Sequence, residues 1–474
     1  MKKAISIFSG LLVIMTAVFI RLHQNMESIF VSVNTVEILQ SMDKDDSENL
    51  KSTDEKQQSV KGSKDEQTVK AKQVLQGRLA CVEEYIRYKD SPKTTEEFID
   101  WLSENYGLDV LLELSNCSED LINRDFYAQT GKSLFVLLDD FLGIKDYESK
   151  EGSSGMYVNL TFAGDICLAE DGFVLDYYDT TSGLKDCIGE QIIEKTNNAD
   201  IFMINNEFSF SDRGTALEGK LYTFRAMPER VNILKELGAD IVSLANNHVY
   251  DFGADAFSDT IRILDEAEIR HIGGGANSTE AEKVIYYEVN GMKIGYVAAS
   301  SAEKVRYTPG AGEDSPGIFR MYDATRLLEV VTEADKQCDY LIAYLHWGTE
   351  DSRYFEEYQH ELAVNLINAG VDAIIGGHPH VLQGMEYING KPVIYSLGDF
   401  WFNSETKYTA MVNLCIDING LKELTVIPCI QKNYTTTLLE EEQERTEFFN
   451  YLMDLSPGVA VNGEGAAVMD SVAE

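Results

Sequence analysis

Residues 374–384 read IIGGHPHVLQG, with two histidines two positions apart directly after an apolar run and two glycines. Four other apolar runs also end in residues that bind metals or transfer protons. In chain order, the polar residues at these five ends are Asp165, Glu207, Asn247 with His248, His346, and His378 with His380. Because ligands bind at the carboxyl ends of strands in α/β sheets, we expect these side chains to meet at one sheet edge.

The residue types in this set suit divalent transition metals. Carboxylates, imidazoles and an asparagine carbonyl are ligands for Mn, Fe or Zn, and no thiolate is needed. One carboxylate shared by two ions, with imidazoles in the remaining positions, builds a two-metal centre that activates water and clamps a phosphoryl group. His248, beside Asn247, would then protonate the leaving group.

Each of these residues also has an interpretation without a metal. Asp165 would cap a turn, Glu207 would be a solvated loop acid, and His346 would be a core histidine packed among aromatic residues. For His378 and His380, the two-residue period of a strand and the fixed φ of the intervening proline predict rings that point the same way. The convergence of five strand ends favours the metal site.

The surrounding pattern predicts the elements that would position these residues. From residue 156 to 432, apolar strand-like runs alternate with amphipathic helical stretches, which predicts a layered α/β domain with central sheets flanked by helices. Residues 73–150 predict a small helical module, in which Thr94 and Glu97 have capping-box spacing. Residues 433–474 predict a C-terminal helix and tail.

The first residues predict a membrane anchor. Lys2 and Lys3 precede seventeen uncharged residues, 4–20, and Arg21 follows them. We interpret residues 1–22 as an uncleaved signal-anchor that makes a single-pass membrane protein with its main domain outside the cytoplasm. The alternative is a cleaved signal peptide. Residues 41–72 are highly charged and lack aromatics, which predicts a disordered linker.

The net charge of −39 limits the partners of the chain. A surface this acidic repels phosphate backbones, so we expect no nucleic-acid partner. It attracts divalent cations, but any acidic surface would do the same.

Several of these pieces resemble one known family. FAGDICL, NNEFSF, ADIVSLANNHVYDFG, LHWGTE and GGHPHVLQGMEYINGKPVIYSLGDF resemble the CapA-like family of capsule and poly-γ-glutamate biosynthesis, whose domain is similar to calcineurin-like metallophosphoesterases. The resemblance covers about residues 158–429, and the helical module lies outside it. It implies a metallophosphoesterase-like sandwich of sheets flanked by helices, with one or two bound metal ions.

The resemblance also implies roles for individual residues. It places Asp165, Glu207 and His380 at one metal, and Glu207, Asn247, His346 and His378 at the other, with His248 as the acid. Asp251 would orient His248. Arg225 would meet an anionic substrate, or else form a salt bridge on its loop.

Three positions depart from the related patterns. Dinuclear phosphoesterases usually have Asp-x-His in their first motif, and Cys167 occupies that histidine position. Their bridging ligand usually comes from Gly-Asp-x-x-Asp, whereas here Glu207 must substitute from another motif. Asp399 stands where the CapA-like family more often has asparagine, and it adds a charge.

The resemblance implies a function in capsule or poly-γ-glutamate biosynthesis or export, with a metal-dependent phosphoesterase-like hydrolase site. The implied partners are the membrane, membrane-bound polymer synthase subunits and an anionic envelope polymer. One alternative is a non-catalytic assembly or anchoring factor with a vestigial metal site. Another is a binding module whose helical segment recruits a synthase.

Overall fold

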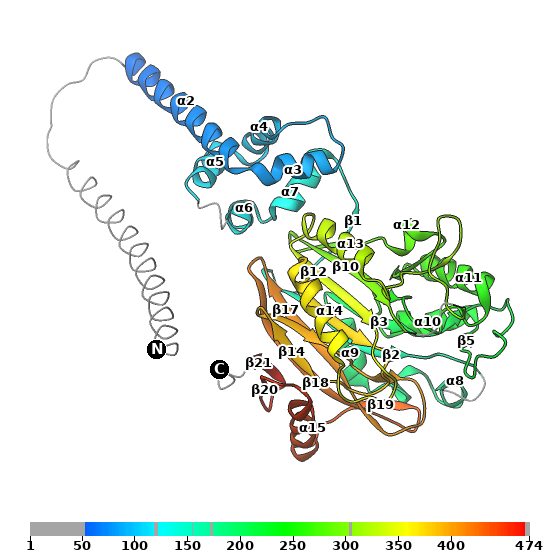
Figure 1. Ribbon diagram of the computed structural model, residues 1–474. Coiled ribbons are helices and arrows are strands. Elements are labelled where there is room, and N and C mark those ends of the chain that lie inside the picture. Colours follow the sequence, from blue (N-terminus) through cyan, green and yellow to red (C-terminus); the bar gives the residue numbers. More distant parts are fainter. Residues whose placement is uncertain (1–52, 118–121, 154, 171–173, 303–305, 470–474) are drawn as a thin grey trace, which may run out of the picture. The chain divides into compact units, whose positions relative to one another are not determined.

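The computed structural model describes residues 53–117, 122–153, 155–170, 174–302 and 306–469 (Figure 1). The predicted anchor, residues 1–22, lies outside them. Within these ranges no helix is both long enough and apolar enough to cross a membrane. The chain divides into two units, residues 1–66 and 67–474, and the second unit contains the sheets and the candidate site.

The helical module has its own apolar core. Its helices are α2 (Thr53–Arg78), α3 (Ala80–Tyr88), α4 (Thr95–Tyr106), α5 (Leu108–Ser115), α6 (Ile122–Thr130) and α7 (Leu134–Leu142). The predicted capping box is confirmed, because Thr94 accepts from the Glu97 backbone and Glu97 accepts from the Thr94 backbone. Phe98, Phe126 and Leu137 are fully buried in this core.

Two predicted boundaries of this region are wrong. Helix α2 begins at Thr53, inside the segment predicted to be a disordered linker. Lysine, glutamate and glutamine favour helix without needing a core, and the last turns of α2 bury Ala71 and Leu75 in the module. The module was also expected to reach residue 150, but Tyr147–Lys150 form strand β1 of the first sheet.

The first sheet has seven strands. In spatial order they are β1 (Tyr147–Lys150), β9 (Ile285–Val289), β10 (Met292–Ser300), β12 (Tyr340–His346), β13 (Ala373–Gly377), β15 (Lys391–Ile394) and β14 (Met385–Ile388). Strands β10, β12, β13 and β15 are parallel neighbours, so their carboxyl ends lie at one edge.

The second sheet has ten strands. In spatial order, eight of them are β20 (Val459–Val461), β21 (Ala466–Met469), β18 (Gly420–Lys432), β17 (Lys407–Asp417), β2 (Val158–Ile166), β3 (Ile201–Asn206), β6 (Ile241–Ser243) and β7 (Arg270–Ile272). The remaining two, β16 (Asp399–Trp401) and β19 (Thr435–Leu438), pair with β2 and β18. Residues 433–474 were expected to form a separate helix and tail, but β19, β20 and β21 make them part of this sheet.

The two sheets pack face to face, and helices cover their outer faces (Figure 1). Buried side chains from both sheets, such as Phe162 and Tyr296, form the core between them. The longer flanking helices are α9 (Glu190–Asn197), α10 (Val231–Glu236), α11 (Gly253–Glu266), α13 (Thr325–Asp335), α14 (Glu357–Asn368) and α15 (Glu442–Leu455). This is a layered α/β fold of the predicted kind.

Strand register brings the predicted site residues to one place. In the second sheet Asp165 of β2 pairs with Asn205 of β3, two residues before Glu207. In the first sheet His346 of β12 pairs with Gly377 of β13, one residue before His378. The Tyr344 hydroxyl donates to the Ala163 carbonyl across the sheets, at 3.2 Å, so the two sets of strand ends lie together.

Candidate metal centre

Asp165 lies near the end of β2 and is fully buried. Its carboxylate accepts from the Asn205 side chain at 2.8 Å and from the His378 backbone N–H at 3.0 Å. Gly377 lies against it, and a Cβ atom at Gly377 would be 2.5 Å from Asp165 Oδ1. The absence of a side chain at residue 377 therefore lets the loop after β13 approach the carboxylate.

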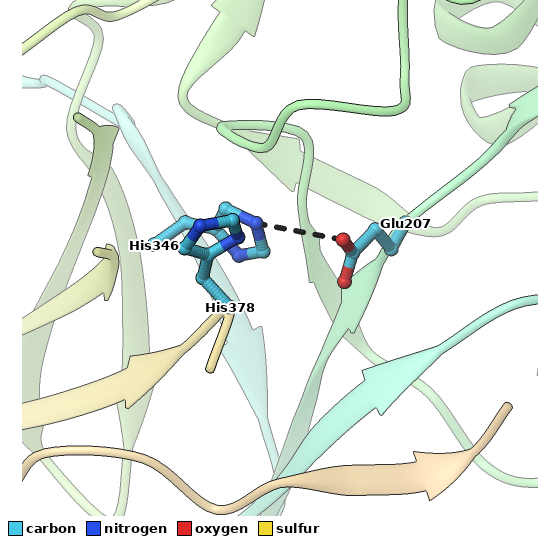
Figure 2. Close-up of side chains that lie close together, drawn as sticks. All are labelled: Glu207, His346 and His378. Carbon is cyan, nitrogen blue, oxygen red and sulfur yellow. Dashed lines mark ion pairs between the residues drawn. The ribbon is translucent and has the colours of Figure 1, made fainter. Parts of the chain in front are cut away.

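One group of potential ligands consists of Glu207, His346 and His378 (Figure 2). His346 Nε2 lies 3.6 Å from Glu207 Oε1, and the His346 and His378 ring centroids are 4.7 Å apart. Asn247 Oδ1 lies 2.7 Å from His346 Nε2. The ligand atoms of the group lie within 4.8 Å of one another, which suits a single ion.

A second group consists of Asp165, Glu207 and His380. His380 Nδ1 lies 3.9 Å from Asp165 Oδ2, and His380 Nε2 lies 3.8 Å from Glu207 Oε1. Glu207 belongs to both groups, as a ligand shared by two ions would. The structure thus brings together all six predicted ligands, and Glu207 is common to two of the potential ligand groups.

Two buried atoms at this centre have no hydrogen-bond partner. They are Glu207 Oε1 and His378 Nδ1. Buried polar atoms are normally paired, because an unpaired one carries its full desolvation penalty. A carboxylate oxygen and an imidazole nitrogen are both electron-pair donors, so a divalent transition metal fits these positions.

Burial and mutual repulsion change the acidity of the two carboxyl groups. Burial is the main cause that raises the pKa of Asp165, to about 6. Burial, followed by the charge of Asp165, raises the pKa of Glu207 well above its ordinary value. Two carboxylates this close resist joint ionisation unless a cation lies between them.

The histidines differ in protonation. Burial lowers the pKa of both His346 and His378 well below the ordinary value, so they are neutral and their ring nitrogens can bind a metal. Burial acts the same way on His380, but the neighbouring carboxylates Asp399 and Glu207 outweigh it and raise its pKa to about 10. Without a metal, protonated His380 is therefore the cation of the cluster.

Asp399 has a clear neighbour in the structure. Its Oδ1 lies 2.7 Å from His380 Nδ1, and Lys407 approaches its Oδ2 at 3.4 Å. A carboxylate on one imidazole nitrogen fixes the ring and directs the other nitrogen to a metal. The sequence shows the extra charge of Asp399 but gives no sign of this contact, because β16 and the loop after β13 are brought together only by the fold.

His248 and Asp251 form a hydrogen-bonded pair. His248 Nδ1 lies 2.7 Å from Asp251 Oδ2, and Asp251 also accepts from the Phe224 backbone at 2.8 Å and from Lys220 at 2.6 Å. The Phe224 ring packs on the His248 ring, with centroids 4.2 Å apart. Burial lowers the pKa of His248 below its ordinary value, and the opposing charge of Asp251 only partly offsets this effect. Lys220 was not identified from the sequence.

Arg225 has a different neighbourhood. Its guanidinium lies 4.2 Å from the centre of the Phe252 ring and donates to the Arg213 carbonyl at 3.2 Å. It follows Phe224, so it lies just beyond the aromatic ring that covers His248. These contacts support the Arg225 loop but do not bring its charge to the ligand groups.

The loop that carries His378 and His380 differs from the expectation. Strand β13 ends at Gly377, and the two histidines have positive φ angles of 96° and 57°. They lie in a turn, so the period of a strand does not orient them, and their ring centroids are 6.1 Å apart. Both rings still contribute to one potential ligand group, with Glu350, but a turn and not the expected strand period orients them.

Glu350 forms a third potential ligand group with His378 and His380. It is exposed and lies in the loop after β12, four residues beyond His346. The motif LHWGTE contained this residue, but its place after a glycine turn gave no indication that it would face the later histidines.

Comparison with known proteins identifies relatives of this fold and site. The family model described as "Bacterial capsule synthesis protein PGA_cap" matches residues 159–404, slightly more than half of the chain. The capsule biosynthesis protein CapA of Bacillus anthracis is 32% identical over 211 residues, which are 43% of this chain and 50% of that protein. The PGA biosynthesis protein CapA of Bacillus subtilis is 31% identical, over 42% of this chain and 53% of that protein.

A probable polyglutamine synthesis accessory protein of Mycobacterium tuberculosis is 30% identical, over 44% of this chain and 58% of that protein. The chain thus matches about half the length of these relatives. Among solved structures, the NAD nucleotidase of Haemophilus influenzae is 12% identical and covers 63% of each chain, with a TM-score of 0.33. A 5'-nucleotidase from Candida albicans is 12% identical, over 65% of this chain and 56% of that one, with a TM-score of 0.34. These scores are too low to establish a shared fold or function.

Proposed function

The chain belongs to the bacterial capsule synthesis protein family PGA_cap, and we propose that it acts in the synthesis or export of a poly-γ-glutamate-type capsule polymer. Its sequence identity of 30–32% to two CapA proteins and to a probable polyglutamine synthesis accessory protein supports this role. In this proposal residues 1–22 anchor the protein in the membrane and the main domain lies outside the cytoplasm. Its partners are membrane synthase subunits and the anionic polymer.

We further propose a metallophosphoesterase-like hydrolase site that holds one or two Mn, Fe or Zn ions. The observation that carries this proposal is the pair of ligand groups that share Glu207, with Glu207 Oε1 and His378 Nδ1 buried and unpaired. When bound, such ions supply Lewis acidity toward water and toward phosphoryl oxygens. The Asp165, Glu207 and His380 group would hold one ion, and Asn247, His346 and His378 would complete the other with Glu207.

The other side chains then control proton transfer. The Nδ1 contact with Asp251 fixes the His248 ring and stabilises its protonated form, so that Nε2 would be the nitrogen that gives a proton to a leaving group. Lys220 holds Asp251 from the other side. Phe224 covers the imidazole and keeps water from one face of it.

The test is the metal content of the purified full chain, measured by elemental mass spectrometry beside a His378→Ala/His380→Ala variant. We expect about one to two ions per chain in the unchanged protein and none in the variant. Hydrolysis of a model phosphodiester, lost in the same variant, would select the enzyme. A metal-free protein that gains no thermal stability from added Mn or Zn would contradict the proposal.

Cys167 favours the second candidate, a non-catalytic assembly factor. It occupies the position where dinuclear phosphoesterases usually carry a histidine ligand, and it is fully buried. Burial raises the pKa of its thiol well above the ordinary value, and among the described residues it belongs to none of the potential ligand groups. Metal binding without hydrolysis of any phosphodiester tested would support this candidate.

A further inference from the structure

A pocket of about 430 Å³ lies beside the metal centre, on the Asp399 side of His380. Its lining begins with the residue after His380 and includes the apolar side chains of Leu382 and Ile430. Tyr451 of α15 forms a wall of it. Two cationic side chains, Arg353 and Lys407, line it as well, and no carboxylate does.

This charge pattern is unusual for the chain, which has 79 acidic and 40 basic residues. Lys407 is partly neutralised, since it lies 2.8 Å from Glu405, 3.4 Å from Asp399 and 4.0 Å from Asp351. Arg353 is exposed and lies 5.8 Å from the centre of the Tyr451 ring. Among the described residues it forms no ion pair, so its charge is available to an anion.

We propose that this pocket binds a carboxylate-bearing side group of an acidic polymer and holds it next to the metal centre. The proposal rests on the proposed function, which brings such a polymer to this face. A γ-linked glutamate unit has two methylene groups in its backbone and a carboxylate on its α-carbon, so it would place the methylene groups on Leu382 and Ile430 and the carboxylate at Arg353. Inorganic phosphate has no apolar part, so it would make no contact of this kind with Leu382 and Ile430.

Lys407 connects the pocket with the centre. It lines the pocket and also contacts Asp399, whose other oxygen contacts His380. A side group bound in this pocket is therefore connected to the predicted metal ligand His380 through the contacts of Lys407 and Asp399. In a protein with a net charge of −39, such a local cation is the means by which an anionic chain can be held close.

The test is calorimetric titration of the full chain with a γ-linked glutamate pentamer, with a glutamine pentamer and inorganic phosphate as comparison probes. Arg353→Gln should weaken binding of the glutamate pentamer by roughly tenfold, the size of one charge-assisted hydrogen bond. Arg353→Lys should restore most of the affinity because it keeps the charge. Arg87→Gln removes the same charge from the exposed surface of α3 and should have no effect.

Three results would overturn the assignment. They are equal binding of the glutamine pentamer, unchanged binding by Arg353→Gln, and full displacement of the pentamer by an equal concentration of phosphate. Metal content is measured in the same samples. A metal-free unchanged protein would contradict the proposed function, whereas normal metal content with no effect of Arg353→Gln would contradict only the pocket.

Discussion

The candidate metal centre and the contact between the helical module and the first sheet both bury charged side chains, but the charges are balanced differently. At the contact, Lys293 Nζ lies 2.6 Å from Asp139 and 2.8 Å from Asp146, and Tyr85 donates to Asp139 at 2.5 Å. At the centre, Asp165 and Glu207 are close together, and Glu207 Oε1 has no hydrogen-bond partner.

The difference separates an ion cluster whose charges are balanced by side chains from one that contains buried donor atoms without hydrogen-bond partners. Lys293 supplies the positive charge of the first cluster, so that cluster is complete with the protein's own side chains. At the second, protonated His380 is the cation that lies between Asp165, Glu207 and Asp399, and donor atoms remain without hydrogen-bond partners. Burial of charge alone is therefore weak evidence for a functional site, and the balance of partners distinguishes the two.

The largest effect should come from breaking the complete cluster. Lys293→Met leaves Asp139 buried without its cation, and we expect the free energy of unfolding to fall by about 3–5 kcal/mol. Urea denaturation measures this change. Lys132→Met, which removes a partly exposed lysine paired with Asp140, should cost about 1 kcal/mol or less. Equal losses in both variants would remove the distinction between this cluster and a surface ion pair.

Glu207→Gln should instead lower metal affinity and leave the stability of the metal-free protein nearly unchanged. It removes the ligand shared by both groups, so metal affinity should fall by more than about a hundredfold, beyond the effect expected for an outer hydrogen-bond partner. The metal-free protein should change little in stability, because the loss of the Glu207 contact with His380 is offset by the removal of a buried charge whose Oε1 has no hydrogen-bond partner. Equilibrium dialysis with Mn measures affinity. Glu350→Gln, at the exposed third group, is the matched control, and retention of both ions by Glu207→Gln would contradict the shared-ligand arrangement.

Asp399→Asn should weaken metal binding by about 10–100-fold, because His380 loses the carboxylate that orients it. The control is Glu405→Gln, since Glu405 also contacts Lys407 but not His380. Nuclear magnetic resonance of the His380 ring should show its pKa falling in Asp399→Asn only. Equal metal affinity in the two variants would contradict a positioning role for Asp399.

The smallest effect should come from a change of a single pH unit. The pKa of Asp165 rises from 3.8 to about 6, so below pH 6 a metal must displace its proton, and affinity should fall at least tenfold per pH unit. For the metal-free fold, the raised pKa means a stability contribution present below pH 4 and lost as pH rises through 6. Metal titrations and thermal unfolding from pH 4 to 8 measure both trends. A pH-independent affinity would contradict this assignment.

The sequence predicts much of the metal centre because the ligands follow apolar strands. The ends of β2, β12 and β13 are defined by runs of buried residues, and parallel pairing within the first sheet brings His346 beside the start of the His378 loop. Asp165 comes from the second sheet, so the packing of the two sheets, and not one sheet edge as expected, brings it to the histidines. No sequence pattern indicates the turn at His378 and His380. Their positive φ angles depend on the approach of Asp165 to Gly377, which joins segments more than two hundred residues apart.

Regions without a strong local pattern were predicted less well. Strand β1 is four residues long and lies at a sheet edge, so its residues show no clear alternation. The strands after residue 433 are also short and gain their stability from pairing with β18. Helix α2 shows the converse case, in which residues of high helix propensity form a helix although they lack the composition of a core.

The approach of Gly377 to Asp165 affects how relatives of this chain should be compared. A single methyl group at residue 377 would lie 2.5 Å from Asp165 Oδ1, so the carboxylate or the loop would have to move. A lineage can therefore lose the centre while it keeps every metal-binding side chain. Conserved ligands in a homologue are thus insufficient evidence for a working centre, and the glycine before the histidines has to be inherited with them.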